Sequence, residues 1–472
     1  MKCNLFYANV SLCLVCAGLM LVSCEKTPGI RVSSDYVIID AFPEEPVNVD
    51  ISVKVDWTVK VIHTDEAWLT VNPLQGKGDA TITIEAAENH EFTERIARIA
   101  ISGVGVKTDT IRVVQMPDMD ISEYIEDEAF REYCLREFDK SPTDGKLSMK
   151  EARSVAKETA INVRRLHIKS LAGIEYFVRV EKLYCNDNEI ESLDVSKNLA
   201  LRDLNCSNNS IKSLEVSANV ELRKLNCSYN PIQHIDVSEL EKLTDLDIYN
   251  AELTSIDVSN NARLMWLAVS NNKVANIDVS KNPELQGLEC NDNGLTSLTV
   301  SNNLKLRTLY CGSNKLNTLN LEKNTELTHL WCNNNQFSVL NLNNNKDLQT
   351  FVCSNNNFSS INLSTNTKLT QLICNTNHIT TLNLNNNPDL KQLHCDANQL
   401  TSLDLSSNTK LEDLSCTANQ LPKELSINKN DRLNYIDVRN NSNLTTIYVW
   451  QGFIEDERYH KKDKDAQWVK LP

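Results

Sequence analysis

Residues 201–221, LRDLNCSNNSIKSLEVSANVE, are one copy of a phrase that occurs thirteen times between Val180 and Leu444. Its consensus is L-x-x-L-x-C-x-x-N-x-L-x-x-L-x-V-S-x-N-x-x, and its period is 21 residues. An insertion at Leu421–Ile427 delays the last copy, which begins at Leu433, by one residue. A fixed period of this length is typical of stacked supersecondary units, in which neighbouring turns cover the apolar face that one turn cannot bury alone. The phrase therefore predicts a solenoid over more than half of the chain.

The spacing of apolar residues indicates how each turn folds. Leu204 and Cys206 are two residues apart, so they share one face of an extended segment, and Leu225 and Cys227 repeat the pattern in the next copy. Stacked segments of this kind form a parallel sheet along one side of the coil, and later apolar residues such as Ile211 close the other side. At about 4.8 Å per strand, the turns should stack into a rod or arc about 60 Å long.

The phrase resembles the leucine-rich repeat, in a short bacterial variant with Cys at the third inward position. The resemblance implies an α/β-type leucine-rich repeat solenoid, mostly β with little helix, over residues 180–446, with a C-terminal cap at 447–472. It also implies a ligand site on the concave sheet, as in many leucine-rich repeat proteins.

Two repeated positions have structural interpretations. A buried amide at the ninth position can bond backbone groups of its own and adjacent turns that would otherwise lack partners. Buried free Cys behaves as a small hydrophobe, and apolar residues replace it in some copies, so disulfide and metal-binding roles are not expected there. The asparagine column, broken at Ala251, is Asn188, Asn209, Asn230, Asn272, Asn293, Asn314, Asn335, Asn356, Asn377, Asn398, Asn419 and Asn441. The cysteine column is Cys185, Cys206, Cys227, Cys290, Cys311, Cys332, Cys353, Cys374, Cys395 and Cys416.

The first residues have the pattern of an export signal. Lys2 precedes an apolar stretch that is too short for a comfortable membrane span, and Leu21-Val22-Ser23-Cys24 follows. This resembles a bacterial lipobox, which implies a signal peptide at 1–23, lipidation of Cys24 and a tether at 24–30. The alternative is an ordinary secretory signal cut nearby. The resemblance implies a lipid-anchored protein of the outer membrane, surface-exposed or, as the alternative, facing the periplasm.

Residues 31–116 have short β-rich runs separated by Gly and Pro breaks, which favour a small immunoglobulin-like antiparallel sandwich. The order of Asp56-Trp57-Thr-Val, Ala67-Trp68-Leu-Thr-Val and Ile111-Arg-Val-Val-Gln115 resembles the BACON domain of Bacteroidetes, a family named for proposed carbohydrate binding. Trp57 and Trp68 lie in or beside expected strands, where core packing is the commoner role. We therefore expect a spacer, with glycan binding as the alternative.

Residues 117–179 are expected to form a helical linker and N-terminal cap. Between helices expected at Ile121–Phe138 and up to about Thr159 lies a segment that resembles an EF-hand calcium loop. That loop needs Gly at its sixth position and Glu at its twelfth, but counting from Asp139 places both one residue late. We therefore expect no cofactor, and calcium remains the alternative. Its candidate ligands are Asp139, Ser141, Thr143, Asp144 and Glu151.

Composition and motifs argue against several function classes. The net charge of −15 disfavours nucleic acid, whose phosphates need clustered Lys and Arg. The sequence contains no G-x-S-x-G elbow, phosphate-binding Gly loop, dinucleotide fingerprint or zinc-protease motif, so we do not expect an enzyme. A uniform solenoid also offers a surface rather than a closed pocket.

The fifth position of the phrase points away from the core, between the inward Leu and Cys. Its residues are apolar over four consecutive turns and polar in most of the others, so they predict an exposed apolar strip that marks an interaction site. Its alternatives are a self-association face or a strip covered by a loop. The candidate ligand-binding residues are Tyr310, Trp331, Val352, Ile373 and His394 of this column, with Trp266 and His329 of the third position.

A second outward column lies within the L-x-V part of the phrase. It carries Asp or Glu in the first five copies and Thr, Asn or Asp in the later ones, which would allow cation binding. A solvated, hydrogen-bonding ladder is the favoured interpretation.

Two functional hypotheses follow. The first is a non-catalytic surface lipoprotein that binds a protein or peptide on its concave sheet. The second is a glycan-binding accessory protein of a polysaccharide-uptake system, motivated by the BACON-like domain and the aromatic strip. In both, the only membrane contact is the lipid on Cys24.

Cys24→Ser tests the tether. Without the thiol the chain cannot be lipidated, so we expect it in the soluble fraction rather than the detergent phase of a phase-partitioning assay. Unchanged detergent partitioning of this variant would contradict the lipobox interpretation.

Overall fold

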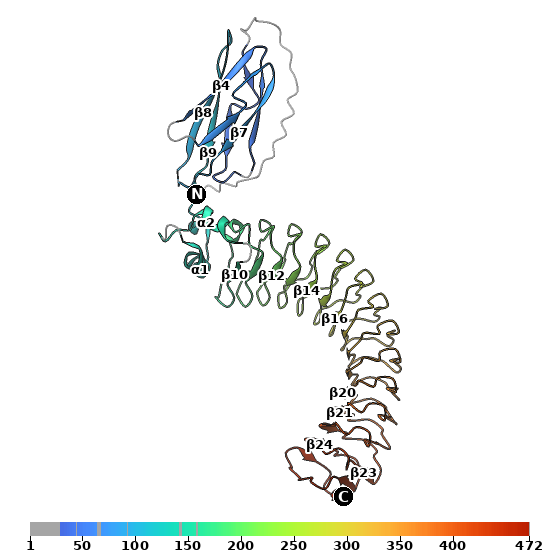
Figure 1. Cartoon of the computed structure of the whole chain (residues 1–472). Coiled ribbons are helices and arrows are strands. Elements are labelled where there is room, and N and C mark those ends of the chain that lie inside the picture. Colours follow the sequence, from blue (N-terminus) through green and yellow to red (C-terminus); the bar gives the residue numbers. More distant parts are fainter. Residues whose placement is uncertain are drawn as a thin grey trace. The chain divides into compact units, whose positions relative to one another are not determined.

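The computed structural model describes residues 29–43, 45–63, 68–91, 93–140, 144–156 and 159–471. The predicted signal segment and Cys24 lie outside these residues. The chain forms two compact units, Met1–Met119 and Asp120–Pro472 (Figure 1). Over the described ranges, none of the helices has the length and apolar character needed to span a membrane.

The first unit is a sandwich of two sheets. One sheet has the strand order β1-β3-β7-β5 and the other β2-β9-β8-β4-β6. The pairs are antiparallel except β2 with β9, which run parallel. The bounds are β1 (Arg31–Val32), β2 (Tyr36–Ile39), β3 (Val47–Ser52), β4 (Asp56–His63), β5 (Leu69–Asn72), β6 (Gln75–Lys77), β7 (Ala80–Ala86), β8 (Arg95–Gly103) and β9 (Asp109–Gln115).

Both tryptophans of this unit belong to its core. Trp57 is 1% exposed and Trp68 is 7% exposed. The Trp57 indole N–H donates to the carbonyl oxygen of Gly78 at 2.9 Å, which satisfies its polar atom inside the core. Its ring lies so close to Gly76 that a Cβ there would come within 2.3 Å of it. The predicted core role of both side chains is confirmed.

The second unit opens with η1 (Ser122–Tyr124), α1 (Glu128–Phe138) and α2 (Met149–Ser154). The expected helix over Ile121–Phe138 begins later because Asp127 caps it, accepting the backbone N–H of Phe130 at 3.1 Å. The second helix also ends earlier than about Thr159, at Ser154.

Helix α1 covers the open end of the solenoid. The hydroxyl oxygen of Tyr133 accepts the N–H of Asn162 in the first strand at 3.0 Å. Phe138 packs against Phe177 with 5.3 Å between ring centroids, beside η2 (Ile174–Tyr176). An end turn would otherwise expose its apolar core.

The repeats build one parallel sheet of fifteen short strands, which Figure 1 shows along the inner side of the arc formed by this unit. The sheet begins at residue 160, one strand before the first predicted repeat. Each strand pairs in register with the next, and the middle residue of every three-residue strand is buried, such as Leu309 beside Leu330. The bounds are β10 (Ala160–Asn162), β11 (Lys182–Tyr184), β12 (Asp203–Asn205), β13 (Lys224–Asn226), β14 (Asp245–Asp247), β15 (Trp266–Ala268), β16 (Gly287–Glu289), β17 (Thr308–Tyr310), β18 (His329–Trp331), β19 (Thr350–Val352), β20 (Gln371–Ile373), β21 (Gln392–His394), β22 (Asp413–Ser415), β24 (Tyr435–Asp437) and β26 (His460–Lys461).

The insertion near the C-terminus starts a second, smaller sheet. β23 (Glu424–Ser426), β25 (Thr446–Val449) and β27 (Gln467–Lys470) pair in parallel. The second and third of these strands lie at the predicted C-terminal cap and complete this small sheet, whereas the main sheet ends on β26.

The asparagine column is a hydrogen-bonded ladder. Asn335 Nδ2 donates to the carbonyl oxygens of Cys311 in the preceding turn at 2.9 Å and of Cys332 and Asn333 in its own turn at 3.2 Å each. Its Oδ1 accepts the N–H of Leu316 at 2.9 Å. The residue before each ladder Asn has a positive φ, as at Asn334 (55°), so the bend leaves the sheet sharply there. The predicted ladder is confirmed.

The cysteine column packs behind the strands. These thiols are free and buried, and each is 0% exposed. Burial raises the pKa of the Cys206 and Cys311 thiols to about 12, so they stay protonated and unreactive. The expected role as small apolar core groups is confirmed.

A second asparagine column, at the nineteenth position, escaped the sequence analysis. Asn324 is fully buried, and its Nδ2 donates to the carbonyl oxygens of Val300 and Asn303 in the preceding turn at 2.9 Å each. The same pair of bonds recurs at Asn303 and Asn345. Most turns are therefore joined to their neighbours by amides on both sides of the core; Ala251 and Leu240 interrupt the two columns.

Asn335→Ala tests the ladder. It removes partners from buried backbone groups, at about 1–3 kcal/mol for each group left unsatisfied. We expect a lower melting temperature and free energy of unfolding, with binding retained by whatever array remains folded. Asn385→Ala is the matched control, because that side chain is exposed. Unaltered melting of Asn335→Ala together with lost binding would show that this residue is functional rather than structural.

Candidate functional site

Four apolar residues stand side by side on the exposed face of the inner sheet. The strand register pairs Tyr310 with Trp331, Trp331 with Val352, and Val352 with Ile373. Trp331 is 40% exposed and the other three are half-buried. These four residues are called the apolar strip below.

The apolar strip begins with a stacked aromatic pair. The rings of Tyr310 and Trp331 have centroids 4.6 Å apart and an angle of 27° between their planes. Each ring therefore limits the freedom of the other, while the Trp331 side of the pair stays exposed. Such a pair offers a rigid aromatic surface without the entropy cost of ordering it on binding.

The other sequence candidates lie at different distances from the strip. His329 belongs to the same strand as Trp331, and its ring shares a 2.9 Å hydrogen bond with the Thr328 hydroxyl. Trp266 is two strands before Tyr310, and its ring lies on Gly287, where a Cβ would come within 2.1 Å. His394 follows Ile373 and contacts the Asp413 carboxylate at 3.0 Å.

Two carboxylates, Asp247 and Glu289, lie beside this surface. Their fifth-position column predicted only that they are polar. Asp247 and Glu289 flank Ala268 in the register of three successive strands. Burial raises the pKa of both carboxyl groups, and the Asp247 charge raises that of Glu289 further. The sequence could have indicated these two carboxylates through the small residues Ala268 and Gly287, which leave space around the Asp247 and Glu289 side chains.

The outward L-x-V column serves the turns themselves. The carboxylate of Asp257 accepts the backbone N–H of Ser259 at 2.9 Å, and Asp278 does the same for Ser280. These bonds hold the pKa of both carboxyls below the usual range. This agrees with the expected hydrogen-bonding ladder and gives the carboxylates a local structural partner.

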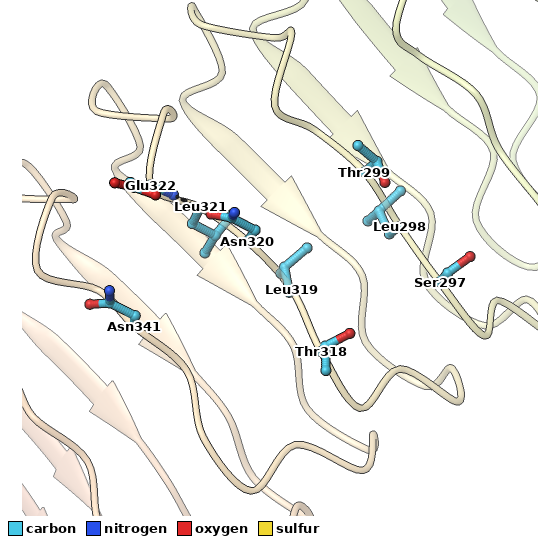
Figure 2. Close-up of a pocket in the computed structure, with 9 residues that line it drawn as sticks. All are labelled: Ser297, Leu298, Thr299, Thr318, Leu319, Asn320, Leu321, Glu322 and Asn341. Atoms are coloured by element: carbon cyan, nitrogen blue, oxygen red, sulfur yellow. Dashed lines mark hydrogen bonds between the residues drawn. The ribbon is translucent and has the colours of Figure 1, made fainter.

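A pocket of about 460 Å³ lies along this outward column (Figure 2). It separates the extended segment Ser297–Thr299 from Thr318–Glu322 of the next turn, with Asn341 beyond. The strands on the inner side of the arc are hydrogen-bonded at every turn. Because the outer side of an arc is longer, neighbouring turns must lie farther apart there. The pocket follows from that divergence and brings together no group of chemical interest beyond Glu322.

The loop after α1 uses its carboxylates internally. Asp139 accepts the backbone N–H groups of Asp144 at 3.3 Å and of Gly145 at 2.9 Å. Glu151 accepts those of Lys140 at 2.9 Å and of Ser148 at 3.0 Å, closing a capping box on α2.

The described carboxylates Asp139 and Glu151 bind backbone N–H groups of their own loop, and the candidate ligands Ser141 and Thr143 lie outside the described residues. Over the part of the chain that the structure covers, no three His, Cys, Asp or Glu side chains are placed to hold a metal ion.

Comparisons with known proteins agree with this architecture. Residues 57–116 match the BACON family model, described as "Putative binding domain, N-terminal". The functional domain of InlJ from Listeria monocytogenes, described as including a cysteine ladder, is 28% identical, with a TM-score of 0.56 over 72% of this chain and 84% of that one. An internalin, InlF, from Listeria monocytogenes is 24% identical, with a TM-score of 0.54 over 68% of this chain and 97% of that one. The search of curated proteins gives no match.

The fold is therefore a mostly β solenoid of the leucine-rich repeat type, preceded by a β-sandwich that matches the BACON family model over residues 57–116. A matched binding domain next to an open repeat surface is the architecture of a non-catalytic binding protein.

Calcium binding can be tested by melting. Because the loop is out of register and its carboxylates are already bonded, millimolar calcium should leave the melting temperature almost unchanged. A large upward shift that disappears in Asp144→Ala would show that the loop closes around a metal after all.

Proposed function

We propose that this chain is a cell-surface lipoprotein that binds a protein or peptide on the inner sheet of its repeat array, with Trp331 as the anchor. The stacked pair of Tyr310 and Trp331, in which Trp331 is exposed, carries the proposal. It lies at one end of a row of apolar side chains on a sheet whose register is held at every turn.

An exposed Trp is costly at a position that faces solvent. Polar residues occupy the same column before and after the strip, at Asp247, Glu289 and His394. Large aromatic residues surrounded by other contacts are the usual anchors of protein interfaces, because their neighbours exclude water around them. Val352 and Ile373 would provide that apolar surround for Trp331 on one side, and Tyr310 on the other.

The shape of the strip favours a protein over a glycan. A sugar ring can stack on Tyr310 or Trp331, but its hydroxyl groups need polar partners, and the next two strands offer Val352 and Ile373 in the same column. In the first unit, Trp57 and Trp68 are buried, so neither ring is presented to a glycan. An apolar or amphipathic protein segment fits the strip better.

The cellular location remains a proposal from the sequence. A lipid on Cys24 would hold the chain at the outer membrane, and the β-sandwich would separate the array from that anchor. The exposed strip suits a surface-facing orientation, where a partner protein can reach it.

Trp331→Ala tests the anchor. Because the side chain lies outside the core, the melting temperature should stay almost unchanged, while affinity for a protein ligand found by screening should fall by about 2 kcal/mol or more. Val339→Ala is the control, since Val339 belongs to the same turn and is 76% exposed. It should change neither property.

Three results would count against the proposal. Unfolding of the array by Trp331→Ala would place this side chain in the core. Unchanged affinity would place the site elsewhere. A glycan-array signal that the wild-type chain gives and Trp331→Ala loses, with no protein ligand found by screening, would support the glycan alternative.

A further inference from the structure

Glu289 stands between two aromatic groups on the inner sheet. In the strand register its neighbour on one side is Tyr310, the first ring of the stacked pair. Two residues before it in its own strand is Gly287, which carries the ring of Trp266. Residues two apart in a strand share a face, so Trp266, Glu289 and Tyr310 border one area of the surface. This area is called the Glu289 notch.

The carboxylate of Glu289 has no ion pair or hydrogen bond anywhere in the described residues. Other carboxylates on the inner face do have partners. Asp203 accepts the Tyr184 hydroxyl at 2.9 Å, and Asp247 accepts Asn226 Nδ2 at 3.0 Å. Glu289 is half-buried, so its charge is only partly solvated and would gain from a counter-charge.

The strands around the notch supply no Lys or Arg. The outward positions of β14 to β20 contain no Lys or Arg, as the strand sequences from Asp245 to Ile373 show. Asp247, two strands before Glu289, adds a second negative charge about 10 Å away. The surface beside the apolar strip is therefore negative and uncompensated, and its complement is a positive group.

We propose that the Glu289 notch binds an arginine side chain of the protein ligand, while the apolar strip takes apolar side chains of the same segment. This inference rests on the proposed function of the inner sheet. A guanidinium suits the notch because it is planar and always charged. It can lie against the faces of Tyr310 or Trp266 while it donates hydrogen bonds to the Glu289 carboxylate.

The spacing is compatible with one short segment. Glu289 and Trp331 are two strands apart, which is about 10 Å across the sheet, and about three residues of extended chain span that distance. An arginine followed at alternate positions by leucines would place all three side chains on the side that faces the sheet.

The test uses two acetylated, amidated pentapeptides and the full chain. One is Arg-Thr-Leu-Thr-Leu, and the other has citrulline, a neutral analogue of nearly the same shape, in place of arginine. Isothermal titration calorimetry measures both. We expect the arginine peptide to bind at least ten times more tightly at low salt, with a ratio that falls as salt screens the charges.

Glu289→Gln should abolish this ratio without changing the affinity for the citrulline peptide. The control is Glu284→Gln, an exposed carboxylate that already pairs with Lys305 at 2.6 Å, and it should preserve the ratio. Circular dichroism melting of both variants checks that the fold is intact.

The outcomes separate the two proposals. Equal affinity of the wild-type chain for both peptides, with both lost in Trp331→Ala, would contradict the arginine notch and leave the binding strip standing. A preserved arginine preference in Glu289→Gln would place the cation elsewhere. If neither peptide binds, the proposed arginine site at the Glu289 notch is contradicted. The apolar strip is then tested separately, by the effect of Trp331→Ala on the affinity for a protein ligand found by screening.

Discussion

The side-chain amide of the ladder asparagine is the interaction on which the repeat array depends. A turn of 21 residues that contains no helix must bend sharply after its strand, and the bend leaves backbone groups inside the coil with no partner in their own segment. One Asn side chain meets this need, since Asn335 serves three carbonyl oxygens and one N–H from two turns. Any residue without both donor and acceptor atoms would leave some of these groups unsatisfied.

The ladder also gives the array its functional geometry. Because each amide joins its own turn to the one before it, successive strands stay in register, and side chains at one repeat position form a straight row. The chemistry of such a row at each turn then depends only on which residue that turn places there. Polar groups in most turns keep the face solvated, whereas Tyr310, Trp331, Val352 and Ile373 create one apolar strip, and Glu289 adds a charge at its border. A constant scaffold thus carries a local and specific surface.

The periodic features were predictable from the sequence, because a period of 21 residues and strict alternation leave little freedom in which side chains point inward. The solenoid, the first asparagine ladder, the buried cysteines and the outward column follow from this. Features that depend on single contacts did not. The start of α1 depends on the Asp127 cap, and β10 has no consensus residues. The second asparagine column was visible in the consensus, but its role needed the bonds between turns. The notch depends on Trp266 leaning onto Gly287, which no repeat pattern encodes.

Hydroxyl-radical footprinting tests the central claim, that the apolar strip of the inner sheet is the binding surface, most directly. Trp and Tyr side chains react readily when exposed, so the full chain can be labelled alone and with a protein ligand obtained by screening. The account predicts strong protection of Trp331 and Tyr310, with no change at the outer segments 297–299 and 318–322 or at the buried Trp57 and Trp68. Protection confined to the outer side or to the first unit, with Trp331 labelled equally in both states, would contradict it.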